Sequence, residues 1–483
     1  MSPALKNFCT KILWVKGLTM GETEKVSAYL SRSKFEDLPS DVVDHAKKTI
    51  SDTIACGLGG TKSREGDILL DMMKDLGGNP VATVIGDKTK LPLIQAAQVN
   101  CVLTNILDYD ETVVKIGHMS TILVPVALAI GEHVRASGKD IINSVVLGCE
   151  LIVRLREAIE PSEEAFWKTF ERVGSGIHLG ATVVAGKLLG LNGGQMADAL
   201  GLTGMVRPTR VTMSDKTAKG MPRWMKITAG DIVIPGIQSA FLARRGFQGD
   251  RSMLDQGRGY EASVGSDRFD AGKLTANFGD NYGILRIGFK AYPACRHISA
   301  TLDAVEAILS ENNVDVDRIN RVVVKAQKFV AKGFSVYGPE HPIQAQFSIP
   351  YTVTMVLLGV SPGPGWYTDS MLKSPKVREL QQKVKVEEDP IIMENYYREN
   401  TYSSSVEMTT NGGKQFSKTI ENPKGDPKNP FTEQDLIDKL TNMAVWSGLK
   451  QRQIDALIQT LANLDNIDDI NELTRLLVPR DPD

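Results

Sequence analysis

The chain has 483 residues, of which 42% are apolar and 24% are charged, and this composition is typical of a folded, soluble protein with two or three domains. Its formal net charge of −2 and sequence pI near 6.4 give no electrostatic reason to expect nucleic acid or an anionic membrane as a partner. No apolar stretch approaches the roughly 18 residues that cross a bilayer, so we expect a small-molecule ligand, no membrane and no nucleic acid.

The N-terminal segment and the cysteines bear on the cellular compartment. The first twenty residues carry lysines but no acid, which faintly resembles a mitochondrial presequence, yet they lack arginine and contain few serines. The five cysteines are scattered, odd in number and never spaced as C-x-x-C, which favours a reducing compartment and argues against disulfides and a zinc cage. We expect a loose N-terminal tail on a cytoplasmic protein, with a mitochondrial location as the alternative.

The segment 20–280 is predicted to be mostly helical. Apolar residues recur there at helical spacing, and most runs have Gly or Pro near an end. Small residues such as Ala181, Ala185 and Ala199 let helices approach closely, as in a large helical domain rather than a parallel sheet. The predicted helices cover 41–56, 95–107, 120–136, 140–159, 176–189 and 235–246.

The pattern changes after about residue 281. The β-branched run 321–325 predicts a strand, and 401–420 predicts two strands around the hairpin signal Asn411-Gly412-Gly413. Helices are expected at 298–309 and 349–358. The segment 281–428 is therefore predicted to be a smaller α+β domain.

The last part of the chain, 429–483, is predicted to be helical again. Thr432 followed three residues later by Asp435 is typical of a helix N-terminus. The apolar face of that helix needs a partner, so we expect the segment to return to the domain formed by 20–280. The residues of this face are Leu436, Leu440, Met443 and Ala444.

One polar stretch lies between two apolar runs, 102–107 and 122–130. It reads Leu-Asp-Tyr-Asp-Glu-Thr, places carboxylates at Asp108, Asp110 and Glu111, and has a histidine ten positions after Asp108. Neighbouring carboxylates push one another's pKa apart, and histidine titrates near neutrality, so such a cluster suits proton transfer. The competing interpretation is that these acids are helix caps or solvated loop residues.

Several familiar motifs fail on spacing. The segment 57–63 lacks the G-x-x-x-x-G-K-[ST] pattern of a phosphate loop and is better explained as a helix end. The segment 174–176 lacks the flanking glycines of the G-x-S-x-G nucleophile elbow. The six histidines never form H-x-H or H-E-x-x-H, and no dinucleotide fingerprint is present. The sequence therefore predicts no metal and no organic cofactor.

A second cluster, Phe-Lys-Ala-Tyr-Pro-Ala-Cys-Arg-His at 289–297, follows the change of pattern. Lysine and arginine bind carboxylates through charge-assisted hydrogen bonds, and arginine does so in bidentate fashion, so Lys290 and Arg296 are candidates for holding an acidic substrate. The alternative is a strand-to-helix turn whose basic residues are merely solvated.

These stretches together resemble the MmgE/PrpD family, which contains 2-methylcitrate dehydratase, cis-aconitate decarboxylase and iminodisuccinate epimerase. The resemblance covers nearly the whole chain and implies a large all-helical domain with a smaller α+β lid, the active site between them, a homodimer and no cofactor. The motifs that carry it, in chain order, are Asp108-Tyr-Asp-Glu-Thr112 with His118, Gly186-Lys-Leu-Leu-Gly190-Leu191 with Ala199-Leu-Gly201, Gly230 with Gly236–Ala243, Lys290-Ala-Tyr-Pro-Ala-Cys-Arg296, Gln346–Tyr351, and Pro423-Lys-Gly-Asp-Pro427 with Asn429-Pro430.

The resemblance also assigns residues to the site. Asp108 and His118 match the family's acid and histidine, and Lys290 matches the lysine that opens the lid-domain motif. Two positions depart from the pattern. Glu171 stands where the family commonly has the histidine of H-P-x-G, and in the segment M-x-K-x-x-H-x-G the histidine is replaced by Thr228 while the lysine is displaced by one position to Lys226.

We therefore predict a cofactor-independent lyase that acts on a di- or tricarboxylate, or on an alkylcitrate-like relative, by proton transfer next to a carboxylate. His118 oriented by Asp108 is the predicted base, with Lys226 and Glu171 as reserve catalytic candidates. Loss of water is the first expected outcome. Decarboxylation and epimerisation share the same carbanion-like intermediate and are the alternatives. The alternative from another class of function is a family member without catalytic activity. The predicted substrate-binding residues are Lys290, Tyr292, Cys295, Arg296, His297 and Thr112.

Overall fold

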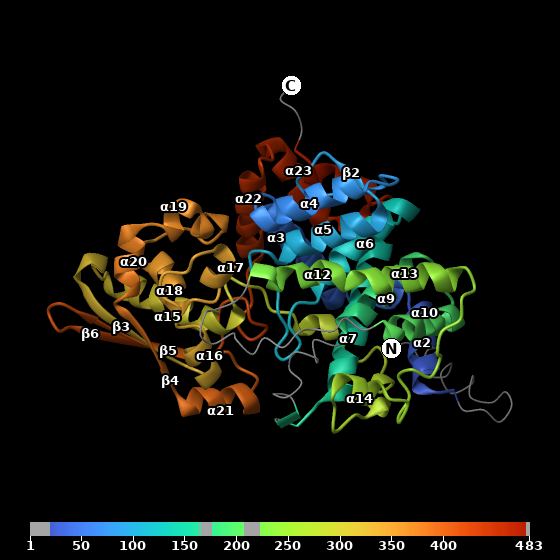
Figure 1. Cartoon of the computed structure of the whole chain (residues 1–483), viewed down its shortest axis with the longest axis horizontal. Helices are drawn as coiled ribbons and strands as arrows, with labels where there is room; N and C mark the ends of the chain where they lie inside the picture. Colours follow the sequence, from blue (N-terminus) through green and yellow to red (C-terminus); the bar gives the residue numbers. More distant parts are fainter. Residues whose placement is uncertain (1–19, 163, 166–175, 207–222, 480–483) are drawn as a thin grey trace.

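The computed structural model describes residues 20–162, 164–165, 176–206 and 223–479, which form a helical part and a part built on a four-stranded sheet (Figure 1). Most helices of the first part lie close to their predicted positions. Their bounds are α2 (Glu22–Arg32), α3 (Ser40–Gly60), α4 (Arg64–Leu76), α5 (Leu93–Asn105), α6 (Ser120–Val134), α7 (Gly138–Ile159), α9 (Ile177–Leu188), α10 (Gly193–Met205), α12 (Thr228–Asp231), α13 (Val233–Arg244) and α14 (Tyr260–Val264). A short β1–β2 hairpin (Ala82–Thr83, Lys90–Leu91) was not predicted.

The centre of the helical part is α6, which is buried on every side from Ser120 to Glu132. A helix that is apolar all round is stable only when other helices surround it, and α5, α7 and α9 pack against it. Close packing also explains the glycines of 57–63. A side chain at Gly60 would overlap the carbonyl of Leu103 on α5, which confirms that this segment is the end of α3 rather than a phosphate loop.

The sheet has the strand order β4-β3-β5-β6. Strand β3 pairs in parallel with β4 and antiparallel with β5, and β5 and β6 form the predicted hairpin. Successive side chains of a strand point to opposite faces of the sheet. Val322 and Val324 on β3 are buried with Val406 and Met408 on β5, on the face that α15 covers. The strand β4 was missed because its sequence, Val-Lys-Val-Glu-Glu, is polar and short.

The elements of this part have the following bounds. The strands are β3 (Ile319–Ala326), β4 (Val384–Glu388), β5 (Ser404–Thr410) and β6 (Gln415–Ile420). The helices are α15 (Arg296–Asn312), α16 (Lys328–Gly333), α17 (Pro342–Ala345), α18 (Ile349–Leu357), α19 (Asp369–Leu372), α20 (Pro375–Gln381) and α21 (Pro390–Arg398). These confirm the predicted fold class, a helical domain joined to an α+β domain.

The C-terminal helices are α22 (Glu433–Ser447), α23 (Gln451–Ala462) and α24 (Asn471–Thr474). The predicted capping box is present, because the hydroxyl of Thr432 accepts the Asp435 N–H and the Asp435 carboxylate accepts the Thr432 N–H. Helix α22 packs on α3, where a Cβ at Gly59 would lie 2.6 Å from the sulfur of Met443 (Figure 1). On this packing we propose that 429–483 belongs with the helical part. Among the described helices, none has both the length and the apolar character that crossing a bilayer requires.

Candidate active site

The polar stretch after α5 forms a buried loop that leads into α6. Asp108 adopts a left-handed backbone conformation (φ 52°), and its side chain is 2% exposed. Further along, Glu111 Oε1 accepts the N–H groups of Met119 and Ser120 at 2.6 and 2.5 Å, which places its carboxyl group at the N-terminus of α6. The backbone of Thr112 pairs with Gly288, so the loop is fixed to the segment that carries Lys290.

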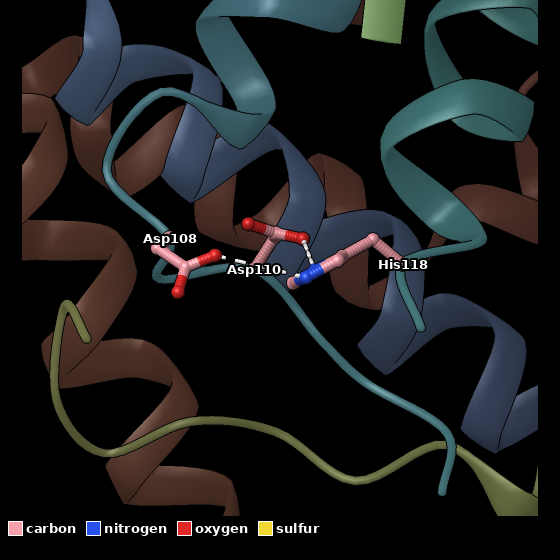
Figure 2. A group of neighbouring side chains, drawn as sticks. All are labelled: Asp108, Asp110 and His118. Carbon is pink, nitrogen blue, oxygen red and sulfur yellow. Dashed lines mark hydrogen bonds and ion pairs between the residues drawn. The ribbon is translucent and has the colours of Figure 1, made fainter. Parts of the chain in front are cut away.

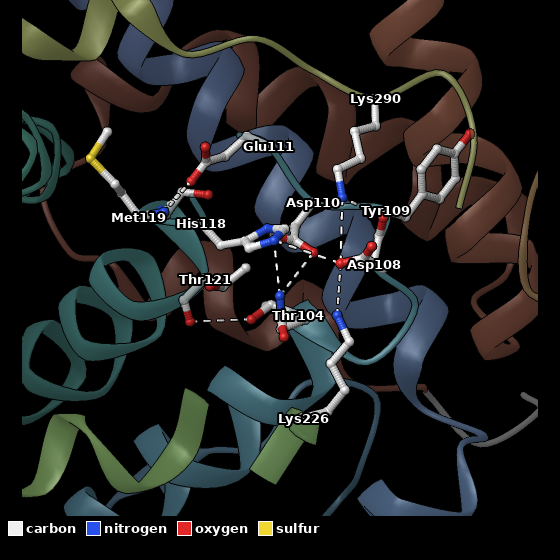
Figure 3. Close-up of polar contacts among 12 residues, drawn as sticks. Thr104, Asp108, Tyr109, Asp110, Glu111, His118, Met119, Thr121, Lys226 and Lys290 are labelled. Carbon is white, nitrogen blue, oxygen red and sulfur yellow. Dashed lines mark hydrogen bonds and ion pairs between the residues drawn. The ribbon is translucent and has the colours of Figure 1, made fainter. Parts of the chain in front are cut away.

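Two buried lysines approach Asp108 from opposite sides (Figure 3). Lys226 Nζ, from the short 3₁₀ turn Arg223–Ile227, lies 2.7 Å from Asp108 Oδ1. Lys290 Nζ lies 3.5 Å from the same oxygen and donates to the Asp108 carbonyl at 2.7 Å. Burial alone would raise the pKa of Asp108, but the two ammonium groups outweigh it and hold that pKa well below the ordinary range.

His118 is the most accessible member of the group, with a half-buried side chain that is 32% exposed. Its Nδ1 is hydrogen-bonded to Asp110 Oδ2, and its Nε2 lies 3.6 Å from Asp108 Oδ1, so both carboxylates face the imidazole (Figure 2). The sequence predicted Asp108 as the residue that orients this histidine; in the structure Asp110 is hydrogen-bonded to the ring, while Asp108 is engaged mainly by the two lysines. An ionised carboxylate only accepts hydrogen bonds, so Asp110 favours the proton on Nδ1 and leaves Nε2 to exchange a proton with a ligand.

The carboxylate of Asp110 is also held by a hydrogen-bond donor from α5. Asn105, the last residue of α5, donates Nδ2 to both Asp110 oxygens at 3.2 Å. Burial would raise the pKa of Asp110, but His118 and the nearby lysines outweigh this effect and lower it. Asp110 therefore remains an anionic acceptor for the imidazole.

Asp108, Asp110 and His118 offer ligand atoms within 4.8 Å of one another, a set that could approach a metal ion. However, Lys226 and Lys290 already neutralise Asp108, and their positive charges oppose a further cation. The two ammonium groups therefore leave little negative charge in this set to hold a metal ion.

Two of the predicted substrate-binding residues in the segment 289–297 have partners within the protein. Arg296 is buried, lies 3.2 Å from Asp426 and donates to the Phe289 carbonyl at 2.8 Å, so its guanidinium group is engaged by the protein itself in this structure. Tyr292 donates its hydroxyl to Glu306 at 2.6 Å and is likewise engaged within the α+β part.

Three further residues were predicted to contact the substrate. His297 packs between the rings of Phe329, Tyr396 and Tyr402, and burial lowers its pKa to about 3, so it is a neutral residue of an aromatic core rather than a cation. Burial and Asp108 raise the pKa of Cys295 to about 12, which keeps it a thiol. Thr112 has a buried hydroxyl without a hydrogen-bond partner among the described residues.

Of the two positions that depart from the family pattern, one can be placed. Glu171 lies outside the described residues. Thr228 begins α12, and its hydroxyl donates to the Met225 carbonyl at 2.9 Å. This hydrogen bond stabilises the turn that carries Lys226, so the displaced lysine still reaches Asp108.

Sequence reasoning missed two further groups, Asp110 as the partner of His118 and a buried pair between Lys439 on α22 and Asp52 on α3. Asp110 lay inside the quoted motif, but spacing alone does not tell which carboxylate meets the ring. For Lys439 a signal existed: it is a charged residue beside Leu436 and Leu440 on a face that is otherwise apolar and buried.

The comparisons with known proteins agree with this architecture. Residues 24–271 match the MmgE/PrpD N-terminal domain, and residues 292–464 match the MmgE/PrpD C-terminal domain. The chain is 25% identical over 471 residues to the cis-aconitate decarboxylase of Homo sapiens, covering 94% of each protein. It is 25% identical over 471 residues to that of Mus musculus, covering 94% of this chain and 93% of the mouse protein. It is 24% identical over 488 residues to that of Aspergillus terreus, covering 95% of this chain and 96% of the fungal protein. The chain belongs to the MmgE/PrpD family.

Proposed function

We propose that this protein is a lyase that acts on a small di- or tricarboxylate through proton transfer at a carbon next to a carboxylate. The observation that carries the proposal is the accessible imidazole of His118, held by the buried Asp110 beside two buried lysine ammonium groups. An imidazole placed in this way exchanges a proton with a ligand, and the ammonium groups stabilise negative charge that develops on it.

The roles follow from the contacts. His118 transfers the proton at Nε2, and Asp110 keeps the ring in the required tautomer and orientation. Lys226 and Lys290 supply positive charge, while Asp108 holds them in place when no substrate is bound. Since these groups can act without a redox centre or a Lewis acid, the proposal includes no cofactor. A homodimer, which the family resemblance implies, is also part of the proposal and is tested by analytical ultracentrifugation.

Two chemical outcomes fit this arrangement. Decarboxylation of a cis-aconitate-like tricarboxylate is the one to test first, because three curated relatives that align over more than nine-tenths of the chain are cis-aconitate decarboxylases. In that reaction the C–C bond to a carboxylate breaks, carbon dioxide leaves, and His118 protonates the carbon that receives the electron pair. Dehydration, the outcome first predicted from the sequence, uses His118 in the opposite sense: it removes an α-proton and returns that proton to the leaving hydroxyl, so that water departs.

The test is to incubate the purified full-length protein with cis-aconitate, citrate, 2-methylcitrate and longer alkylcitrates and to follow products by NMR in D₂O. Decarboxylation gives an acid one carbon shorter with deuterium at the protonated carbon, whereas dehydration gives an unsaturated acid of unchanged carbon number. His118→Gln is the matched inactive variant, and His133→Gln, an exposed histidine near the other end of α6, is the control. Binding of a carboxylate without turnover would support the non-catalytic alternative. The absence of both binding and turnover would refute the proposal.

A further inference from the structure

Lys439 is a buried lysine that lies far along the sequence from Asp108 and Lys290 but is joined by hydrogen bonds to the segments that carry them. Its ammonium lies 2.6 Å from Asp52 Oδ1, 2.7 Å from the Tyr109 carbonyl and 3.2 Å from the Lys290 carbonyl. These three acceptors use all three donors that an ammonium group has. The side chain is 3% exposed and also lies against the Tyr109 ring, 3.9 Å from its centroid.

The two carbonyls belong to the segments that carry the site. Tyr109 directly follows Asp108, whose left-handed backbone is unfavourable for a residue with a side chain. Lys290 donates its own ammonium to the Asp108 carbonyl, so the consecutive carbonyls of 108 and 109 are each held by a lysine. Lys439 therefore connects the turn at Asp108 to the backbone from which Lys290 projects.

We propose that Lys439 is a positioning residue, which from helix α22 fixes the Asp108–Tyr109 turn and the Lys290 backbone relative to each other. Asp52 on α3 in turn fixes the ammonium group of Lys439. The geometry supports this role because the residue offers no free donor to a ligand and its hydrogen bonds to the segments that carry the site go to main-chain oxygens. The inference on turnover rests on the proposed function, whereas the inference on the turn does not.

The alternative is that Asp52 and Lys439 are only a structural ion pair. Breaking a buried pair by removing one partner leaves an uncompensated charge, whereas removing both is often tolerated. The two interpretations therefore differ in the double variant Asp52→Asn with Lys439→Met. A structural pair predicts that the double variant recovers both stability and site. A positioning role predicts that it recovers stability only, since the carbonyls of Tyr109 and Lys290 still lack their donor.

The experiment compares Lys439→Met, Asp52→Asn and the double variant by hydrogen–deuterium exchange of the peptide spanning 105–119 and by kcat and KM. The control is Lys187→Met, which removes a half-buried lysine whose ammonium also donates to two main-chain carbonyls, those of Ser31 and Ser33. We expect exchange of the 105–119 peptide to rise roughly ten- to a hundredfold in Lys439→Met and in the double variant, as for loss of a charge-assisted hydrogen bond, and not in Lys187→Met.

For turnover we expect kcat to fall by up to about a hundredfold in both variants that lack Lys439, with a smaller change in KM, because a displaced turn misplaces the catalytic groups. Exchange and kcat at wild-type levels in the stable double variant would overturn the proposal. If the wild-type protein converts no carboxylate, the proposed function fails, but the exchange data still decide the role of Lys439. If Lys439→Met does not fold, the double variant alone makes the comparison.

Discussion

Glu111→Gln should change how the stability of the protein depends on pH. Burial raises the pKa of Glu111 from its ordinary value of 4.5 to about 7, against the opposing effect of the hydrogen bond from the Ser120 N–H. The folded protein therefore keeps a proton that the unfolded chain releases between these two values. The stability from this group is complete below about pH 4.5 and is lost as the pH rises to about 7.

The magnitude follows from the size of the shift. A pKa raised from 4.5 to about 7 corresponds to about 3 kcal/mol, at about 1.4 kcal/mol per pH unit. Glutamine does not titrate and keeps an oxygen that can accept from Met119 and Ser120. Its amide replaces an oxygen that has no partner among the described residues, so a constant cost is expected at every pH.

The assay is urea unfolding of both proteins from pH 4.5 to 8. We expect the free energy of unfolding of the variant, relative to wild type, to rise by about 3 kcal/mol between pH 4.5 and 7 and to stay level above pH 7. Because the carboxyl is buried, high salt should leave this rise in place. A difference that is the same at all pH values would refute the reasoning, as would a difference that falls with pH.

Four further predictions concern the cluster. His118→Gln should lower kcat by about 10²–10⁴ while the protein still binds its carboxylate, and a wild-type rate of substrate proton exchange in D₂O would remove His118 from the mechanism. Asp110→Asn should keep substrate affinity but lower kcat, because the amide no longer fixes the proton on Nδ1; an unchanged kcat would contradict the role of Asp110. Lys226→Met and Lys290→Met should each raise KM roughly ten- to a hundredfold, measured against Lys187→Met. Arg296→Met should leave KM unchanged but lower the free energy of unfolding by about 3–5 kcal/mol, because it leaves the buried Asp426 without its partner. A stable variant with a raised KM would show instead that Arg296 binds the substrate.

The sequence predicted those elements that have a strong local pattern. The strand β3 and the Asn411-Gly412-Gly413 hairpin lie where predicted, because a β-branched run and a turn preference within a few residues determine them. The strand β4 was not predicted, because its pairing with β3 is a long-range contact and its own sequence is mostly charged. Tertiary pairing, not local propensity, makes it a strand.

The candidate site shows the same limit at the level of single side chains. The motif and the family resemblance selected Asp108, His118, Lys226 and Lys290, and the structure brings these four together, although their roles stay predictions. The type of a residue did not predict which partner its side chain faces in the fold. Arg296 had the charge to bind a substrate, yet it packs against Asp426, whose position could be known only from the fold.

The contact between Asp52 and Lys439 has a consequence for biosynthesis. The two residues are 387 positions apart, so at a synthesis rate of about 5–20 residues per second a ribosome adds the lysine roughly 20 to 80 s after the aspartate. During this interval α3 can pack against α5, but the carboxyl group of Asp52 lacks the ammonium group that it meets in the complete protein. A nascent chain that has not yet produced α22 therefore holds an incomplete site, because the carbonyls of Tyr109 and Lys290 lack the ammonium group from which they accept in the complete protein.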